Sequence, residues 1–551
     1  MRYFLHSTVF IFLITQAINS FSCTNYIVTK GASADGSVMI SYAADSHTLY
    51  GELYYKPAKD YPAGTMVEIY EWDSGKPLGK IKQVTHTYSV VGNMNEFQLS
   101  IGETTFEGRN ELVDTTAIVD YGSLIYLTLQ RARTAREAIH TIASIVEEYG
   151  YCSPGESFSI ADKNEAWIFE IVGKGPGNKG ALWAAFRIPD GCVSGHANQA
   201  RIQTFPLNDP ENCLYAKDVI SFARKKGWFK GEDKDFSFSD IYDPIDFEHA
   251  RCCEMRVWAM FNKVNKDMGK YWDYATGHNL HNRMPLYIKP DGKITLHDMM
   301  GFMRDHLEGT ELDMSKDVGA GPFGLPYRWR PLDWKVDSVK YFNERTTATQ
   351  QTGFSFIAQS RSWLPDPIGG ILWFGVDDAS SSVYNPMYCG ITKVPESYAE
   401  GNGDMLTYSE TSAFWAFNYV SNFCYLRYNV MIEDVKKVQK QLESHFIDTI
   451  AEIDKQANIL YKTNKQQAIQ YLTDFSVKIG NNTVSRWKDL GHYLLVKYMD
   501  GNIKKEKDGK FLKNGYTQAA YPSQPGYPKW WLKLILKDTG NRFKEINDTI
   551  H

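Results

Sequence analysis

The order of strand-like and helix-like segments limits this 551-residue chain to a layered fold. Short runs rich in β-branched and aromatic residues come in pairs, whereas helical patterns come in separate blocks. The first pair, residues 25–29 and 37–42, flanks the turn Ala34-Asp35-Gly36, and Asp-Gly between such runs is typical of an antiparallel hairpin. Paired strands and blocked helices favour layered α+β over alternating βαβ units.

The same patterns extend along the chain. Further strands are expected at residues 85–91, 98–101, 158–160, 166–171, 181–188, 369–376 and 382–391, and helices at residues 123–149, 246–264 and 297–306. From residue 432 onward, apolar residues recur every three or four positions, which indicates helices with one buried face. Residues 319–331 and 504–513 are expected to be surface loops. The predicted organisation is therefore a main domain over residues 23–430 and a helical C-terminal segment over residues 431–551, packed on the core.

The first 22 residues have the features of a secretory signal peptide. An apolar run follows Arg2, and small residues stand at Ser20 and Ser22, so cleavage would leave Cys23 at the terminus of an exported, periplasmic or secreted protein. A terminal cysteine combines a thiol of pKa about 8.5 with an α-amine of pKa about 7.7–8.0. Lipidation is disfavoured, because Ser20 and Phe21 do not match a lipidation signal. A structural disulfide at Cys23 remains open.

Composition excludes several classes of function. The formal net charge of −5, without a basic stripe, argues against a nucleic-acid partner. No second apolar stretch is long enough for a membrane span, so no stable membrane insertion is expected after cleavage. The eight cysteines lack CxxC spacing, and no HExxH or phosphate-loop motif is present, so neither a metal nor a cofactor is expected. The oligomeric state is open, and a homo-oligomer is compatible with the sequence.

Several motifs occur together in one order: CTN from Cys23, Asp45-Ser46, NEFQLSIGETT at 95–105, HANQARI at 196–202, RDHLEGT at 304–310 and ILWFGVDDASSSVYNPMYCGIT at 371–392. Together they resemble the C69 family of dipeptidases, relatives of the secernins and of the bile-salt and penicillin acylases. The resemblance covers almost all of the chain after residue 22. It implies the four-layer αββα sandwich of the N-terminal-nucleophile hydrolases with a helical C-terminal extension. It also implies amide hydrolysis through an acyl-enzyme on Cys23.

The resemblance assigns catalytic roles to four residues. Cys23 is the nucleophile, and Asp45 resembles the carboxylate that orients the free amine. Asn198 resembles an amide of the oxyanion hole, and Arg256 resembles a cation that lowers the thiol pKa. Without the resemblance, Asp45 reads as a turn or helix-cap residue, Asn198 as a turn residue and Arg256 as a helix-surface residue.

Three further residues are expected to bind substrate. Glu103 is the candidate for recognising the α-amine of a dipeptide, with a strand-surface glutamate as the alternative. Asn95 and Thr104 are expected to place hydrogen-bond donors near the nucleophile. The chain departs from many relatives at Tyr42, where they carry arginine three residues before the aspartate, so a cation that could support the thiolate is absent at that position.

Three functions follow in order of preference. The first is an exported cysteine peptidase that hydrolyses dipeptides. The second is an acylase of the penicillin V or bile-salt type, which would bind a bulky apolar acyl group instead of a charged amine. The third is a binding protein that kept the fold and lost catalysis. The joint presence of Cys23, Asp45 and Asn198 argues against this third function.

Overall fold

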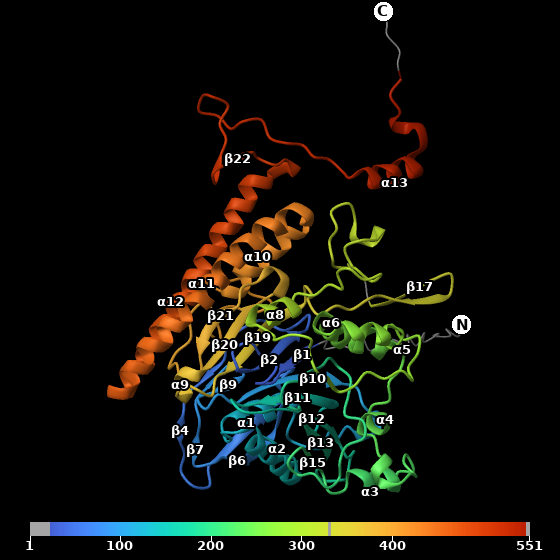
Figure 1. Cartoon of the computed structure of the whole chain (residues 1–551), viewed down its shortest axis with the longest axis vertical. Helices are drawn as coiled ribbons and strands as arrows, with labels where there is room; N and C mark the ends of the chain where they lie inside the picture. The colour runs from blue at the N-terminus through green and yellow to red at the C-terminus, as the bar shows by residue number, and fades with distance from the viewer. Residues whose placement is uncertain (1–22, 329–331, 547–551) are drawn as a thin grey trace, which may run out of the picture.

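Two large antiparallel sheets form the centre of the protein (Figure 1). The computed structural model describes residues 23–328 and 332–546, so the predicted signal peptide and part of the predicted 319–331 loop lie outside the described residues. The first sheet has seven strands, in the order β16 (Tyr287–Ile288), β14 (Val193–His196), β1 (Asn25–Val28), β2 (Val38–Asp45), β19 (Thr352–Ser360), β20 (Gly370–Val376) and β21 (Asn385–Tyr388). The second has eight, in the order β15 (Cys213–Tyr215), β13 (Ala181–Arg187), β12 (Ala166–Gly173), β11 (Gly155–Ala161), β10 (Ser100–Phe106), β9 (Met94–Asn95), β8 (Val90–Val91) and β3 (Tyr55–Lys56).

The hairpin predicted at the start of the described chain is confirmed. β1 and β2 pair antiparallel, with Ile27 opposite Ile40. The turn between them contains Gly36 at φ +82°, a left-handed conformation that glycine adopts without steric cost. Every residue of β2 is buried, as expected for a strand covered on both faces.

The two sheets meet through β1 and β2 on one side and β10 and β11 on the other. Gly102 of β10 permits this close approach, because a Cβ at that position would lie 2.2 Å from Oδ1 of Asn25. The Asn25 amide also donates a hydrogen bond to the carbonyl of Glu103 at 2.5 Å. The sheets are therefore locked together one residue from Glu103 and two residues from Cys23.

Two helices cover the eight-stranded sheet, where the sequence pattern predicted a single helix. α1 (Tyr121–Leu129) packs on β10, and α2 (Ala135–Tyr149) packs on β11, β12 and β13. The prediction of one helix over 123–149 was wrong because the chain carries a second N-cap, Thr134, whose side chain accepts from the backbone N–H of Glu137. Both helices share one apolar face, so the hydrophobic pattern continues through the break.

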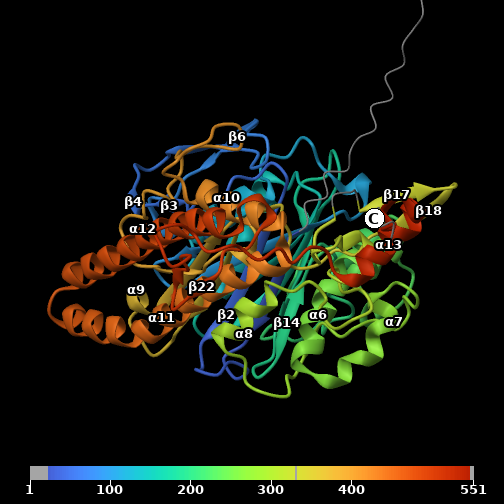
Figure 2. The ribbon, with the colours of Figure 1, turned by 90° about the horizontal axis from the view of Figure 1, so that it is seen from above.

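The C-terminal region is helical, as expected. α10 (Ala413–Tyr425) packs on β20, and α12 (Lys465–Tyr498) packs on β21 and on α11 (Tyr428–Thr463). Figure 2 shows α11 and α12 as a long pair lying side by side. Trp487 of α12 stacks on Phe417 of α10, with ring centroids 4.8 Å apart, and is fully buried. Beyond them, an arm ends in α13 (Lys529–Thr539), set apart from the sheets in Figure 1.

The remaining elements are short, and several differ from the predicted boundaries. The strand expected at 85–91 divides into β7 (His86–Thr87), which pairs with β4 (Lys59–Asp60), and β8. The strand expected at 382–391 is limited to β21, and residues 504–513 include the hairpin β22 (Glu506–Lys507) and β23 (Lys510–Phe511) instead of a plain loop. The others are β5 (Met66–Tyr70), β6 (Pro77–Lys82), β17 (Asp333–Val336), β18 (Val339–Phe342), α3 (Val219–Lys225), α4 (Phe238–Tyr242), α7 (Trp272–Ala275), α8 (Leu296–Phe302) and α9 (Asp366–Gly369).

The predicted helix at 246–264 contains a local change of helix type. α5 (Phe247–His249) continues into a π-helical turn, Ala250–Glu254, and then into α6 (Met255–Val264). The adjacent thiols of Cys252 and Cys253 are both buried in that turn. Such turns redirect the side chains that follow them, and Arg256 is the second residue beyond this one. Within residues 23–328 and 332–546, no helix combines the length and apolar character needed to cross a membrane.

Candidate active site

Cys23 lies just before β1, at the wall of a cavity of about 460 Å³. Its neighbour Thr24 exchanges two backbone hydrogen bonds with Ala43 of β2, at 3.2 and 2.9 Å. The Arg256 guanidinium donates to the Cys23 carbonyl at 2.5 Å and to the Thr24 hydroxyl at 2.9 Å. Sheet pairing and one arginine therefore fix the backbone of the predicted nucleophile.

The thiol of Cys23 faces negative charge. It donates to Oε1 of Glu103 over 3.6 Å and lies 3.7 Å from the hydroxyl oxygen of Tyr42, which donates to the same carboxylate oxygen. Burial, and after it the charges of Glu103 and Asp45, raise the pKa of the Cys23 thiol well above its ordinary value. Tyr42 thus joins the thiol to Glu103.

Asp45 is a buried carboxylate at the end of β2. Its Oδ2 pairs with the Arg345 guanidinium at 2.7 Å, and its Oδ1 accepts from the Thr352 hydroxyl at 2.6 Å. Burial raises its pKa, and the Arg345 charge opposes that shift. The sequence analysis missed Arg345 and Thr352, because they lie about 300 residues from Asp45 and only the pairing of β19 with β2 brings them close.

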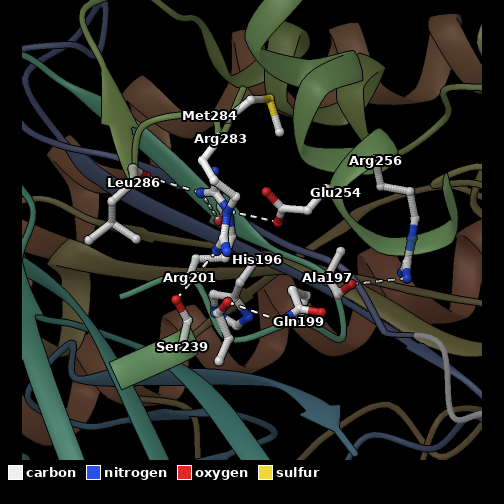
Figure 3. A network of polar contacts seen from close by, with 12 residues as sticks. His196, Ala197, Gln199, Arg201, Ser239, Glu254, Arg256, Arg283, Met284 and Leu286 are labelled. Carbon is white, nitrogen blue, oxygen red and sulfur yellow. Dashed lines mark hydrogen bonds and ion pairs between the residues drawn. The ribbon is translucent and has the colours of Figure 1, made fainter. Parts of the chain in front are cut away.

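Arg256 connects Cys23 to Asn198. Its guanidinium donates to Oδ1 of Asn198 at 2.9 Å and to the Ala197 carbonyl at 3.2 Å, the contact drawn in Figure 3. The structure therefore gives Arg256 a role that was not predicted, holding the backbone at the nucleophile. The charges that dominate the thiol pKa are instead those of Glu103 and Asp45.

Asn198 directs its amide across the gap between the sheets. The amide donates to the Thr105 carbonyl at 2.6 Å, and the residue has a φ of +62°, a conformation that asparagine tolerates better than most residues. The predicted oxyanion role needs a second amide hydrogen aimed at the substrate, and it stays a prediction.

A buried ion pair supports the segment that carries Asn198 (Figure 3). The Arg201 guanidinium pairs with Glu254 at 2.8 Å. It also donates to the backbone carbonyls of Gly195, Pro285 and Leu286. The backbone N–H of Arg201 donates to the Glu170 carboxylate. His196 starts the segment with both ring nitrogens bonded, to the hydroxyls of Thr104 and Ser159. Burial, assisted by the Arg201 charge, lowers the pKa of His196 to about 3, so the imidazole is neutral and structural.

The side chains of Asn95 and Thr104 are hydrogen-bonded within the protein, away from the thiol, so their predicted substrate roles stay predictions that would fall to the backbone. The side chain of Thr104 points to His196 in the opposite sheet. Asn95 is fully buried, where its amide donates to the carbonyls of Leu129 and Ala132, both at 2.8 Å. Its Oδ1 accepts from the backbone of Phe97 and Leu99. Asn95 therefore joins the turn before β10 to the end of α1, and both the amide nitrogen and the amide oxygen of its side chain are hydrogen-bonded within the protein.

Replacing Asn95 with alanine is expected to lower the free energy of unfolding by about 2–3 kcal/mol, because buried carbonyls and N–H groups lose their partners. Chemical denaturation of wild type and Asn95→Ala measures the loss. Asn164→Ala, at an exposed turn between β11 and β12, is the control and should change stability by less than about 0.5 kcal/mol. Equal stability of the two variants would contradict the structural role.

Two glutamates meet on the paired strands β10 and β11. Glu156 of β11 lies opposite Thr105 of β10, whose hydroxyl donates to the Glu156 carboxylate at 2.9 Å. Glu103 lies two residues before Thr105 on β10. Burial and then the charge of Glu103 raise the pKa of Glu156 well above its usual range, which favours the neutral carboxyl. Oε2 of Glu103 and Oε1 of Glu156 are buried without a hydrogen-bond partner in the described part of the chain. The predicted strand at 158–160 stopped short of Glu156, which is why sequence reasoning missed it.

The lining of the cavity is acidic near the thiol and aromatic beyond it. Among the described lining residues, Lys56 is the only cation, and it pairs with Glu400 at 3.1 Å. Asp45, Glu71, Asp73 and Glu103 contribute carboxyl groups, and Tyr54, Trp72, Tyr121, Tyr126 and Phe354 contribute rings. In residues 23–328 and 332–546 no group of three or more metal-ligating side chains could hold an ion. The arrangement suits a nucleophilic attack on a small, positively charged substrate.

The chain is similar to proteins of one peptidase family. The model of peptidase family C69 matches residues 22–441. A protein of Latilactobacillus sakei named "Probable dipeptidase" is 24% identical over 477 residues, covering 84% of this chain and 92% of its own length. A "Probable dipeptidase B" of Streptococcus pyogenes serotype M1 is 23% identical, covering 73% of this chain and 78% of its own. A "Probable dipeptidase" of Salmonella dublin is 25% identical, covering 67% and 81%.

Proposed function

This chain belongs to peptidase family C69, and on that basis we propose that it is a dipeptidase with Cys23 as its nucleophile. The names of its relatives support dipeptides as the substrates. We further propose that the two sheets and their helices form the four-layer sandwich of the N-terminal-nucleophile hydrolases. Residues 1–22 would be removed on export to the periplasm or beyond, which would free the α-amine of Cys23.

The observation that carries the proposal is the 3.6 Å contact between the Cys23 thiol and Glu103 in an acidic cavity. In a dipeptide, one carbon separates the α-ammonium from the carbonyl that is attacked. A carboxylate beside the nucleophile therefore lies where that ammonium must be. An acylase would need an apolar surface at this place, so the geometry favours a substrate with a free amine over the acylase alternative.

In the proposed first half-reaction, the thiol proton of Cys23 passes to its own α-amine, and the sulfur attacks the carbonyl carbon. Asp45 stabilises the ammonium formed in this way, and the Asn198 amide is the candidate donor to the developing oxyanion. The ammonium then gives its proton to the leaving amine, the C–N bond breaks, and the second amino acid departs. The first amino acid remains as a thioester on Cys23.

Water completes the cycle. The free α-amine of Cys23 takes a proton from the attacking water, and the oxygen adds to the thioester carbonyl. The C–S bond then breaks, the thiolate recovers the proton, and the first amino acid leaves. Lys56, the only cation among the described lining residues, pairs with Glu400, so this mechanism depends on the amine more than it would with an arginine in place of Tyr42.

The experiment compares the processed chain with a variant that keeps an extension before Cys23. Intact mass and N-terminal sequencing establish the terminus, and iodoacetamide labelling at pH 7 measures thiol reactivity. We expect the chain that starts at Cys23 to be alkylated at that residue at least about tenfold faster, because a neighbouring ammonium favours the thiolate. Only that chain should hydrolyse dipeptides. A mature terminus elsewhere, or an active extended chain, would exclude the amine–thiol mechanism, and an intact terminus with no hydrolysis would favour the binding-protein alternative.

A further inference from the structure

An unbroken row of aromatic rings leads away from the thiol along the cavity wall. Tyr42 contacts Phe354 with ring centroids 5.7 Å apart, Phe354 contacts Tyr54 at 6.5 Å, and Tyr54 contacts Trp72 at 5.2 Å. Tyr126 also contacts Trp72, with ring centroids 6.5 Å apart. Rings therefore line this wall from Tyr42, whose hydroxyl donates to Glu103, to the connection between β5 and β6, where Trp72 lies.

Trp72 is held firmly although it is 38% exposed. Its backbone N–H donates to Asp120, the N-cap of α1, at 2.7 Å. Its side chain rests on Gly122, where an added Cβ would come within 2.5 Å of it. A large, exposed aromatic ring fixed at the mouth of a cavity is an arrangement suited to ligand contact.

The aromatic wall adjoins the acidic end of the cavity. Asp73 follows Trp72 and accepts a hydrogen bond from the Tyr121 hydroxyl at 2.9 Å, and its charge is close enough to raise the pKa of Glu103. In a dipeptide, the α-ammonium and the first side chain share one carbon. An ammonium at Glu103 therefore directs the first side chain, and not the second, toward the ring of Trp72.

We propose that Trp72, with Tyr54, Tyr126 and Phe354, forms a subsite for a large apolar or aromatic side chain on the first residue of the dipeptide. This inference rests on the proposed dipeptidase function and adds its substrate preference. Burying such a side chain against the rings removes apolar surface from water. An acidic first residue is disfavoured by Asp73 and Glu103, which would face its carboxylate.

The test is a dipeptide panel in which one residue varies at a time. Phe-Ala and Leu-Ala are expected to exceed Ala-Ala in kcat/KM by about tenfold or more, with Asp-Ala the poorest, whereas Ala-Phe and Ala-Leu should differ from Ala-Ala by less. In Trp72→Ala the preference for Phe-Ala over Ala-Ala should fall about tenfold. Trp72→Phe should keep most of the preference.

Trp530→Ala is the matched control, because Trp530 of α13 is also exposed, at 42%, and does not line the cavity. It should leave the preference unchanged. An unchanged preference in Trp72→Ala, or a stronger dependence on the second residue than on the first, would overturn the subsite. Hydrolysis with no first-residue preference would overturn the subsite alone. Absence of all dipeptide hydrolysis by a chain that starts at Cys23 would overturn the proposed function as well.

Discussion

Replacing Cys23 with alanine is expected to reduce kcat/KM for dipeptides by at least about 10⁴-fold, because the sulfur that would form the proposed acyl-enzyme is lost. The measurement is steady-state hydrolysis of a dipeptide by wild type and Cys23→Ala. The variant should fold normally, since the backbone at this position is held by Ala43 and by Arg256 through the Cys23 carbonyl. Circular dichroism and thermal melting check that point.

Cys152→Ala is the control for this prediction. Cys152 is a half-buried free thiol outside the cavity, so its loss should leave kcat/KM within about twofold of wild type. Acid quenching during turnover, followed by intact mass measurement, should show Cys23 carrying the first amino acid only. Activity of Cys23→Ala within tenfold of wild type would place the nucleophile elsewhere.

The second large effect is expected at Glu103. Glu103→Gln keeps the shape of the side chain and removes its charge, so an incoming ammonium loses its buried partner. We expect kcat/KM for dipeptides to fall by about 10²-fold, mostly through KM. N-acetyl dipeptides, which lack the ammonium, should be poor substrates for both proteins.

The pH dependence provides an independent check. Burial raises the pKa of Glu103, so lowering the pH through that raised pKa protonates the carboxyl and should increase KM for wild type. This increase should be absent in Glu103→Gln. Glu111→Gln, in an exposed turn, should behave as wild type. Glu156→Gln should lose less than Glu103→Gln, because burial and the charge of Glu103 raise the pKa of Glu156 and favour its neutral form. A pH profile of KM shared by wild type and Glu103→Gln would rule out this role.

The elements that local sequence determines were the ones predicted well. The β1–β2 hairpin follows from its Asp-Gly turn, and the apolar periodicity from residue 432 identified the region of α11 and α12. Helix ends were less certain, because a polar residue such as Thr134 can start a new helix without interrupting the apolar face. The family followed from motifs spread along the chain, with no single motif sufficient.

The site was predictable only for residues with a motif. Glu103 stands beside the thiol as expected, but the partners of Asp45 could not be read from sequence because Arg345 joins it across a long separation that only the sheet closes. Asn95 belongs to the same motif as Glu103, yet its side chain forms hydrogen bonds with the turn before β10 and the end of α1. A motif identifies a segment of the site, whereas strand direction and turn geometry decide which of its side chains reach the substrate.

The contacts that hold Cys23 have a consequence for how activity would begin. They involve its carbonyl, its side chain and the backbone of Thr24, and none of them requires a free amine. A precursor that still carries residues before Cys23 can therefore fold around the site in its final geometry. Such a precursor would be inactive because it lacks the base and not because its site is misshapen. Cleavage of the peptide bond before Cys23 would supply that base, the free α-amine, to a cavity that is already assembled. Under the proposed mechanism such a precursor would need no rearrangement to become active, and its crystal structure should superimpose on that of the chain that starts at Cys23.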